Sequence, residues 1–216
     1  MKQIILIRHG QAEHQPHNRI GGWSDVNLTE LGIKQAQAVA QRLEELKGTY
    51  KIYSSDLNRA KQTAEIICKQ LEVTPTYAFE LREHNPGNAT GMTREESAKQ
   101  WQPVPDTHIH TLLDWRPNQE SETIREFFSR VTSFMDKINE IEEQVIIVSH
   151  GGTIHNIIRW WIGTPVSDYF KFGFVIANVS LSVLDTNRHG QRIIERLNDT
   201  THYARINTSN PINYPF

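Results

Sequence analysis

The sequence predicts an α/β fold of three layers, in which helices flank a mainly parallel central sheet and a cap of loops and helices covers the carboxyl ends of the strands. Two short apolar runs, residues 4–7 and 145–148, show no polar alternation, which is typical of strands buried on both faces of a parallel sheet. Amphipathic helical stripes lie between these runs. Strands that alternate with helices favour a single α/β domain.

The expected elements follow one another along the chain in strand–helix order. Apolar residues at helical spacing predict helices over residues 36–46, 57–71, 124–141 and 153–162. Short apolar or alternating runs predict strands over residues 4–7, 51–53, 145–148, 179–184 and 192–197. The last two strands are separated by Asn187-Arg188-His189-Gly190, a sequence typical of a hairpin turn.

The domain is expected to cover residues 1–203, with a tail at 204–216. The segment from about 84 to 119 interrupts the pattern, because it holds several prolines and turn-forming residues. We expect a long loop or small cap there, and connections of that length in compact domains are usually functional. The apolar end of the tail, with Ile212, Tyr214 and Phe216, is a candidate to dock on the domain.

Composition and charge exclude several classes of protein. The chain has 216 residues, 23 of them basic and 25 acidic, so it lacks the basic excess of a nucleic-acid-binding protein. Its single cysteine, Cys68, excludes an internal disulfide framework. No apolar run is long enough for a membrane span, and the N-terminal run is too short for a secretion signal. A cytoplasmic protein without nucleic-acid or membrane partners is therefore expected.

Basic side chains follow three of the predicted strands. Arg8 and His9 come directly after the first, Arg59 lies in the helix after the second, and His150 follows the run at 145–148. Because ligands of open α/β sheets bind beyond the carboxyl ends of the strands, these four side chains are expected to converge. Two guanidinium groups and two imidazoles suit a tetrahedral dianion such as a phosphoryl group.

Glycines accompany both histidines. Gly10 follows His9, and Gly151 and Gly152 follow His150. Glycine permits tight backbone geometry and close approach to a ligand. The segment after His150 begins a helix, whose free N–H groups favour an anion.

Five motifs in this order resemble those of the histidine phosphatase superfamily, the phosphoglycerate mutase-like proteins. They are Arg8-His9-Gly10; Asn18-Arg19 with residues 22–26 and 28–32; residues 54–64 around Arg59; Leu81-Arg82-Glu83; and Ser149-His150-Gly151-Gly152. Residues 178–180 and 197–202 are similar to the closing segments of that family. The resemblance covers nearly the whole chain.

The resemblance implies a catalytic role for five residues. His9 would attack phosphorus and form a phosphohistidine, which splits hydrolysis into two transfers. Its attacking nitrogen must be unprotonated, so a backbone carbonyl near Gly10 is expected to hold the proton on the other nitrogen. Arg8, Arg59 and His150 would hold the phosphoryl oxygens, with His150 as a cation because a dianion raises its pKa.

Glu83 would be the proton donor and acceptor of this scheme. It would protonate the leaving alkoxide and then take a proton from the attacking water. The alternative for Glu83 is a structural role, as the partner of Arg82 or Arg94 in an ion pair on a loop. Gly10, Gln15, Gly22 and Gly151 are the further residues expected to contact substrate. The scheme needs no metal and no cofactor.

Departures from the family pattern bear on the substrate. Gln11-Ala12 stands where the family often has Glu-Thr, Gln15 stands where it often has Asn, and residues 84–87 replace its usual aromatic-glycine sequence. The family's mutases carry a longer insertion after the acid and a Glu-Arg-His-Tyr motif, which this chain lacks. A shorter cap admits water to the phosphohistidine, so we expect a phosphatase acting on a small phosphomonoester. A cofactor-dependent phosphoglycerate mutase is the alternative.

Further alternatives concern the cap and the histidines. Basic and aromatic side chains in the cap would suit a phosphorylated acid or sugar; they are Arg94, Lys99, Trp101, His108, His110, Trp115 and Arg116. The two tryptophans are equally consistent with packing of the cap. His108-Ile109-His110 and His14-Gln15-Pro16-His17 have spacings seen in metal sites, although no His-Glu-x-x-His helix is present. A phosphate-binding regulatory protein with little turnover is the non-enzymatic alternative, and an oligomer is possible.

Overall fold

The computed structural model describes residues 3–46, 48–101, 103, 109–141 and 144–206. Six strands form one sheet in this part of the chain, in the order β3-β2-β4-β1-β5-β6. Their bounds are β1 Gln3–Arg8, β2 Tyr50–Ser54, β3 Pro75–Tyr77, β4 Gln144–Ser149, β5 Leu181–Thr186 and β6 Arg192–Asp199. The pairs β1–β4, β2–β4 and β2–β3 are parallel, and β5 is antiparallel to both neighbours. The predicted mainly parallel sheet is confirmed.

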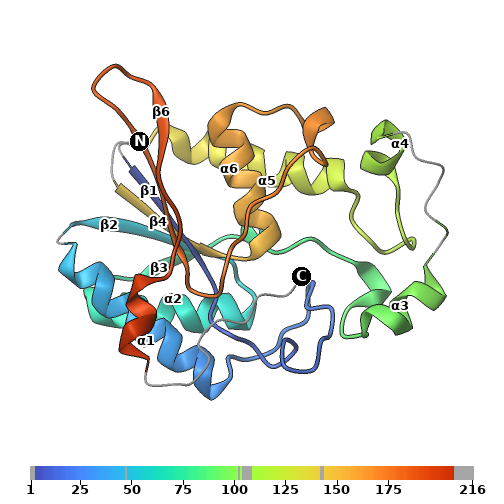
Figure 1. Cartoon of the computed structure of the whole chain (residues 1–216), viewed down its shortest axis with the longest axis horizontal. Helices are drawn as coiled ribbons and strands as arrows, with labels where there is room; N and C mark the ends of the chain where they lie inside the picture. The colour runs from blue at the N-terminus through green and yellow to red at the C-terminus, as the bar shows by residue number, and fades with distance from the viewer. Residues whose placement is uncertain (1–2, 47, 102, 104–108, 142–143, 207–216) are drawn as a thin grey trace.

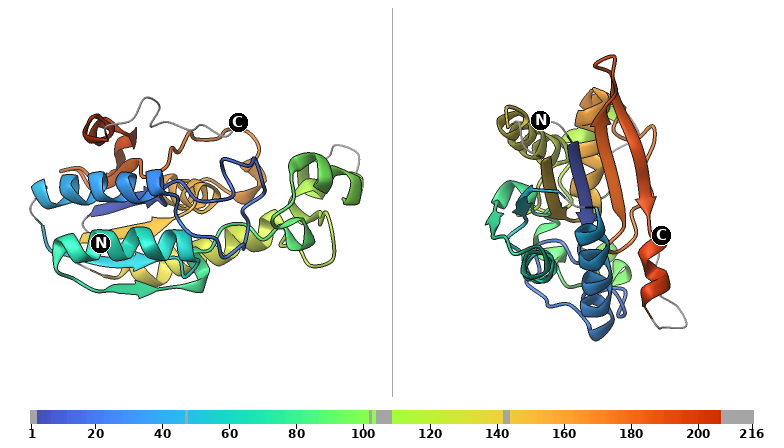
Figure 2. Two further views of the ribbon diagram at one scale, coloured as in Figure 1. Left: turned by 90° about the horizontal axis from the view of Figure 1, so that it is seen from below. Right: turned by 90° about the vertical axis from the view of Figure 1, so that its left-hand side faces the viewer.

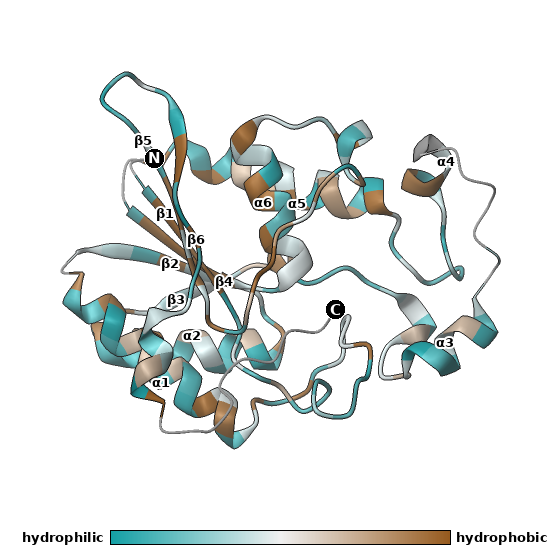
Figure 3. Cartoon of the chain, viewed as in Figure 1, coloured by the Kyte–Doolittle hydropathy of each residue, from teal (hydrophilic) through white to brown (hydrophobic). Residues whose placement is uncertain are grey.

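Helices cover both faces of the sheet, which gives the three predicted layers (Figures 1 and 2). One face packs against α1 (Glu30–Glu45), α2 (Asn58–Leu71) and the 3₁₀ helix η4 (Thr201–Arg205). The other packs against α5 (Ile124–Asn139) and α6 (Gly151–Ile162). Alternate residues of β1 point into the two cores, Ile5 and Ile7 into one and Ile4 and Leu6 into the other. This double burial accounts for the unbroken apolar run, which is brown in Figure 3.

Local signals fix where the main helices begin. The Thr29 side chain accepts a hydrogen bond from the Gly32 amide and caps α1. Thr123 and Glu126 form a reciprocal capping box at the start of α5. α6 begins at Gly151, two residues before the predicted start, and places His150 at its N-cap. None of the helices described here is long and apolar enough to cross a membrane.

The segment at 84–119 contains helices that the sequence reading did not place. They are η2 (Gly87–Ala89), α3 (Arg94–Gln100) and α4 (Ile109–Asp114), and they lie apart from the sheet in Figure 1. Thr93 and Glu96 form a capping box for α3. Of the two forms expected for this segment, a long loop or a small cap, the structure shows a small cap with short helices.

The chain end departs from the expected boundary at residue 203. η4 runs on to Arg205, whose guanidinium pairs with the Glu45 carboxylate on α1 at 2.8 Å. Ile206 is buried in the core beneath α1. The expected docking of Ile212, Tyr214 and Phe216 lies outside the described residues.

Candidate active site

Three neighbouring parallel strands end side by side, and the residues that follow them build the site. The register pairs Arg8 at the end of β1 with Ser149 of β4, and Ser54 of β2 with Val148. His9, His150 and Ser55 are the next residues along these strands. The convergence predicted for the strand ends is therefore present in the fold.

His9 is held as a neutral imidazole. Its Nδ1 lies 2.7 Å from the carbonyl oxygen of Gly10, which accepts the Nδ1 proton. Nε2 lies 3.3 Å from Nε of Arg59 and accepts that N–H. Burial, and then the positive charges of Arg59 and Arg8, hold the pKa of His9 well below its ordinary value. The Nε2 lone pair is therefore available across the neutral pH range.

His150 lies against His9, with their ring centroids 5.1 Å apart. Its Nε2 is 2.8 Å from Oγ of Ser55, and its Nδ1 is buried without a hydrogen-bond partner. Burial, and then the charge of Arg59, keep the pKa of His150 well below its usual range, so the ring is neutral in the unliganded site. The cationic form expected from the sequence requires the charge of a bound dianion.

The two arginines are fixed by backbone carbonyls. Nη1 of Arg8 donates to Ile176 O at 2.7 Å, while its Nε is buried and has no partner. Arg59 donates to Ser24 O and Gly22 O, both at 2.7 Å. Burial lowers the pKa of Arg59 to about 10, so it remains a cation at neutral pH. The arrangement supplies a concentrated positive charge with unused donors, which suits an oxyanion.

Glu83 lies between the cap and α6. Its carboxylate accepts hydrogen bonds from the amides of His84 at 2.8 Å and Gly152 at 3.0 Å, the second of which belongs to the first turn of α6. Its carbonyl oxygen accepts the indole N–H of Trp23 at 2.7 Å. A side chain at position 152 would place its Cβ 2.3 Å from the Glu83 carboxylate, so this close approach requires glycine.

The alternative structural role for Glu83, an ion pair with Arg82 on a loop, is wrong. The Arg82 guanidinium instead forms a two-point ion pair with Asp56, with both N–O distances at 2.7 Å. Arg82 also lies over the rings of Trp23 and Phe79. Glu83 is thus left facing the site, where Arg8 and Arg59 interact with its charge.

Two of the glycines predicted to contact substrate have structural tasks. The Gly10 amide donates to Thr63 Oγ1 at 3.1 Å, and a Cβ at position 10 would lie 2.5 Å from Gly32 O. Gly22 adopts a φ of +43°, and a Cβ there would lie 2.3 Å from the ring of Pro86. Both glycines allow close backbone packing, and the Gly22 carbonyl also orients Arg59.

Gly151 and Gln15 differ in their distance from the charged side chains of the site. A Cβ at Gly151 would be 3.8 Å from Nε of Arg8, so this glycine borders the site. Gln15 exchanges hydrogen bonds with the Asn178 amide at 3.0 and 3.1 Å, and accepts from the Ala12 amide at 2.9 Å. Asn178 in turn donates to His9 O at 2.9 Å. Gln15 therefore supports the loop after His9.

The sequence did not single out Ser55, and it offered His14 only as a candidate for the mouth of the site. Ser55 contacts His150, and its only signal was its position directly after a predicted strand. His14 lies with its ring centroid 6.2 Å from that of His9. Burial, and then the charge of Arg59, lower the pKa of His14 to about 3. We expected most of the histidines that could line the mouth of the site, His14, His17, His84 and His155, to be solvated. His14 is an exception, because it lies half-buried beside His9.

The cap residues divide between packing and surface. Trp101 and Trp115 contact each other edge to face at 6.4 Å, which supports the packing interpretation. Arg116 forms an ion pair with Glu126 of α5, whereas Arg94 and Lys99 are exposed. His108 and the side chain of His110 lie outside the described residues.

The metal alternative gains no support from the part of the chain that the structure describes. There, no three His, Cys, Asp or Glu side chains are grouped closely enough to hold a metal ion. His14 lies by His9, and His17 is exposed. Since His108 is not described, the metal independence of the site stays a prediction.

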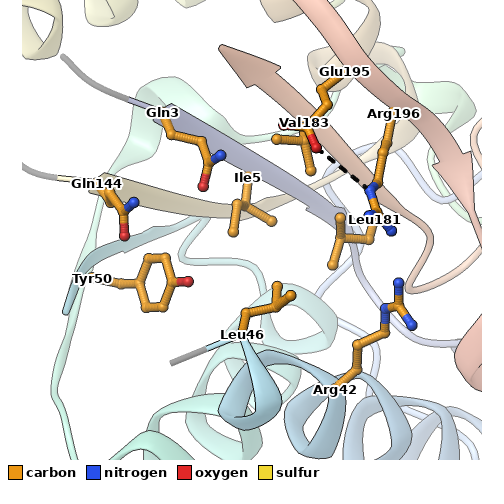
Figure 4. A pocket seen from close by; sticks show the side chains of 10 residues that line it. All are labelled: Gln3, Ile5, Arg42, Leu46, Tyr50, Gln144, Leu181, Val183, Glu195 and Arg196. Atoms are coloured by element: carbon orange, nitrogen blue, oxygen red, sulfur yellow. Dashed lines mark ion pairs between the residues drawn. The ribbon is translucent and has the colours of Figure 1, made fainter. Parts of the chain in front are cut away.

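A separate cavity of about 270 Å³ lies at the opposite end of the sheet (Figure 4). It contacts the first residues of three parallel strands, Gln3, Tyr50 and Gln144. None of the predicted site residues lines it.

The fold and the site define a class: an α/β protein with a histidine and two arginines converging at the ends of its central strands. The profile of the histidine phosphatase superfamily (branch 1) matches residues 4–200. The chain belongs to that superfamily.

Two proteins similar in sequence to this chain are named as phosphoglycerate mutases or as mutase-like. The chain is 32% identical over 213 residues to the probable phosphoglycerate mutase GpmB of Yersinia pestis, a match that covers 94% of this chain and 95% of that one. It is 31% identical over 160 residues to phosphoglycerate mutase-like protein 4 of Arabidopsis thaliana, covering 72% and 69% of the two chains.

Similar solved structures are phosphatases. A phosphoserine phosphatase from Entamoeba histolytica in complex with 3-phosphoglyceric acid has a TM-score of 0.73 at 26% identity, covering 94% of this chain and 99% of that one. The α-ribazole phosphatase of Shigella flexneri has a TM-score of 0.76 at 23% identity, covering 91% and 96%. The second likeness shows the fold alone.

Proposed function

We propose that the protein is a metal-independent phosphomonoesterase that acts on a small phosphorylated metabolite through a phosphohistidine at His9. One observation carries this proposal above the others. His9 is a neutral imidazole whose Nε2 lone pair faces Arg59, while Gly10 O holds the proton on Nδ1. This is the state that an attacking nitrogen needs.

In the first step, Nε2 of His9 forms a bond to phosphorus and the ester P–O bond breaks. Glu83, in its protonated form, gives its proton to the leaving oxygen. Arg8, Arg59 and His150 hold the phosphoryl oxygens. Nε of Arg8 and Nδ1 of His150 are buried without partners, so a bound oxyanion would satisfy both groups.

In the second step, water attacks phosphorus and the P–N bond breaks. The Glu83 carboxylate takes the proton of the attacking water, and inorganic phosphate leaves while His9 returns to its neutral form. Because the positive groups are fixed by backbone carbonyls before substrate arrives, they need little reorganisation during either step.

A phosphoglycerate mutase is the second candidate, and one observation favours it. The Yersinia relative named a probable mutase is matched over 95% of its length, so it is similar in size to this chain. The short cap therefore does not by itself separate hydrolysis from phosphoryl transfer. The similar structure named as a phosphoserine phosphatase supports hydrolysis.

The test is release of inorganic phosphate from p-nitrophenyl phosphate, phosphoserine, phosphoglycerates and sugar phosphates, in the presence of EDTA. We expect turnover that survives EDTA and falls by at least about 10⁴-fold in His9→Ala. An acid-labile, base-stable phosphoprotein should form in the wild type and be absent from His9→Ala. Interconversion of phosphoglycerates without net phosphate release would favour the mutase. Phosphate binding without either reaction would favour a regulatory protein.

A further inference from the structure

Glu83, the proposed proton donor, is placed by a different route from the two histidines. His9 and His150 directly follow β1 and β4, so the register of the sheet fixes them. Glu83 is separated from the short strand β3 by residues 78–82, which include the 3₁₀ helix η1 (Phe79–Leu81). The position of Glu83 therefore depends on the contacts that hold this connecting segment against the rest of the domain.

Arg130 of α5 binds the backbone of that segment. Its Nη1 donates to Glu80 O at 2.8 Å and to Arg82 O at 3.1 Å, and its Nη2 donates to Glu83 O at 3.3 Å. The carbonyls of Arg82 and Glu83 belong to the two peptide groups that flank the Cα of Glu83. One guanidinium therefore fixes the direction in which the Glu83 side chain leaves the main chain.

Glu122 orients the Arg130 guanidinium. Its carboxylate accepts from Nε and Nη2 of Arg130, both at 2.8 Å, and such a two-point ion pair fixes the plane of the guanidinium. The two side chains are only 11% and 12% exposed. The Glu122 amide also donates to Asn85 O at 2.9 Å, and its carbonyl accepts from Nε2 of His84 at 2.7 Å. The residues after Glu83 are thus tied to the same ion pair as those before it.

The first turn of α6 holds the side chain of Glu83. The Gly152 amide donates to its carboxylate at 3.0 Å, and Oγ1 of Thr153 donates to Arg82 O at 2.8 Å. α5 and α6 pack against the same face of the sheet. The main chain of Glu83 is therefore fixed from α5 and its carboxylate from α6.

We propose that Arg130 is a positioning residue: oriented by Glu122, it aims the Glu83 carboxyl group at the leaving oxygen of the substrate. Arginine suits this task because its guanidinium carries five N–H groups in one plane. Nε of Arg130 has one acceptor, and Nη1 and Nη2 have at least two each. This inference rests on the proposed function, because it concerns the delivery of a proton by Glu83.

The test compares two kinds of ester in Arg130→Met. The alkyl ester is whichever of phosphoserine, 3-phosphoglycerate and glycerol 3-phosphate the wild type hydrolyses fastest, and the aryl ester is p-nitrophenyl phosphate. Alkyl turnover should fall about 10–10²-fold, since misplacing a reacting group by about 1 Å costs about 10²-fold. Aryl turnover should fall at most about threefold, because its leaving group is stable as an anion. Arg130→Lys should give an intermediate alkyl loss, since lysine keeps the charge beside Glu122 but not the planar fork.

Combined variants separate positioning from a general loss of stability. Glu83→Gln has no proton to deliver, so adding Arg130→Met to it should cause no further loss on the alkyl ester. Arg130→Met with Glu122→Met removes both charges, leaves neither unpaired, and should show the same selective loss as Arg130→Met alone. Where Glu83→Gln itself is selective for the alkyl ester, the proposal would be overturned by equal losses on both esters in Arg130→Met, or by a full additional loss in the Glu83→Gln background.

Arg42→Met is the matched control. Arg42 also forms a partly buried ion pair, with Asp199 at 3.1 Å, but it belongs to α1 on the other face of the sheet. Its loss should leave the ratio of the alkyl and aryl rates unchanged.

The NMR signal of the Gly152 amide reports the position of the Glu83 carboxylate without turnover. It should shift in Arg130→Met and in Glu83→Gln, and stay in place in Arg42→Met. If no ester is hydrolysed, or if Glu83→Gln lowers both rates equally, the proposed acid fails, and this signal alone decides whether Arg130 holds the carboxylate. If alkyl turnover depends on Glu83 but Arg130→Met changes neither the signal nor the alkyl rate, positioning by Arg130 fails and the proposed function stands.

Discussion

The proposed phosphate pocket, formed by Arg8, His9, Arg59 and His150, is built by different means from the cap. In the pocket, charged side chains emerge from the ends of adjacent strands and are held by backbone carbonyls, as Arg59 is by Ser24 and Gly22. The cap instead consists of short helices, η2, α3 and α4, held by a few buried residues such as Leu113 and by exposed ion pairs such as Arg125–Asp114. The geometry of the pocket therefore follows from the register of the sheet, whereas the cap depends on a small number of individual contacts.

We expect this difference to separate the residues that perform the reaction from those that select the substrate. Helices of six or seven residues are not stable alone, and exposed ion pairs contribute only about 0–1 kcal/mol each. Substitutions in the cap are therefore expected to alter the part of the site that holds the leaving group of the substrate. They should not move His9, Arg8 or Arg59. Two regions with such unequal support should respond differently to substitution, and three experiments test this.

The largest effect is expected from Glu83→Gln, which removes the proposed acid at the border of the two regions. Glutamine keeps an acceptor for the Gly152 or His84 amide but has no proton to give. Turnover of alkyl phosphates should fall by about 10²–10⁴-fold, since their leaving groups need protonation. Turnover of p-nitrophenyl phosphate should fall much less, because its leaving group is stable as an anion. Steady-state rates on the two substrates measure the difference.

A matched control is Glu80→Gln in the same stretch of chain. Glu80 is paired with Lys137 at 3.9 Å, so its loss should leave both rates unchanged. Equal losses on alkyl and aryl esters in Glu83→Gln would mean that Glu83 supports the shape of the pocket and is not the acid.

Much of the fold could be predicted from the sequence because two strands are buried on both faces. The runs at 4–7 and 145–148 became β1 and β4, and the long stripe after residue 124 became α5. β3 was missed since it has three residues and begins with Pro75, which suits an edge strand. The cap helices were missed because α3 buries only Ser97 and so shows no apolar period.

The site was predictable to the same extent as the sheet. Residues that directly follow strands, such as His9 and His150, could be placed by topology alone. Ser55 contacts His150, and His14 is partly buried. Both facts depend on the direction of a side chain, which cannot be predicted from hydrophobic periodicity. Tyr169 contacts Arg159 only because the chain after α6 folds back on that helix, which the sequence pattern does not show.

The second experiment tests whether the pocket takes up protons with its ligand. His9 and His150 are neutral in the free site because burial and Arg59 lower their pKa values. A bound dianion favours the imidazolium form, so binding should tighten as pH falls, by at most about tenfold per pH unit for each proton. Sulfate is the probe, since its charge is constant over the neutral range. Calorimetry at several pH values measures the affinity.

His150→Gln should flatten this pH dependence, because glutamine can donate a hydrogen bond but does not titrate. The exposed His189→Gln, in the hairpin turn, is the matched control and should leave the slope unchanged. An affinity for sulfate that does not change with pH in the wild type would show that His150 stays neutral in the complex, and the cation expected from the sequence would be wrong.

The smallest effect is expected from Asn118→Ala, which loosens the cap where it meets the core. Asn118 donates to Pro86 O at 2.9 Å and accepts from the Glu120 amide at 3.1 Å. Losing these bonds should cost about 1 kcal/mol in the free energy of unfolding, measured by denaturant titration, and raise KM a few-fold. Asn187→Ala removes comparable bonds in the hairpin, to Gln191 and the His189 amide, so it should cost similar stability and leave KM unchanged. If Asn118→Ala instead lowered kcat on p-nitrophenyl phosphate as strongly as it raised KM, the cap would be part of the reaction centre, and the separation of chemistry from substrate choice would fail.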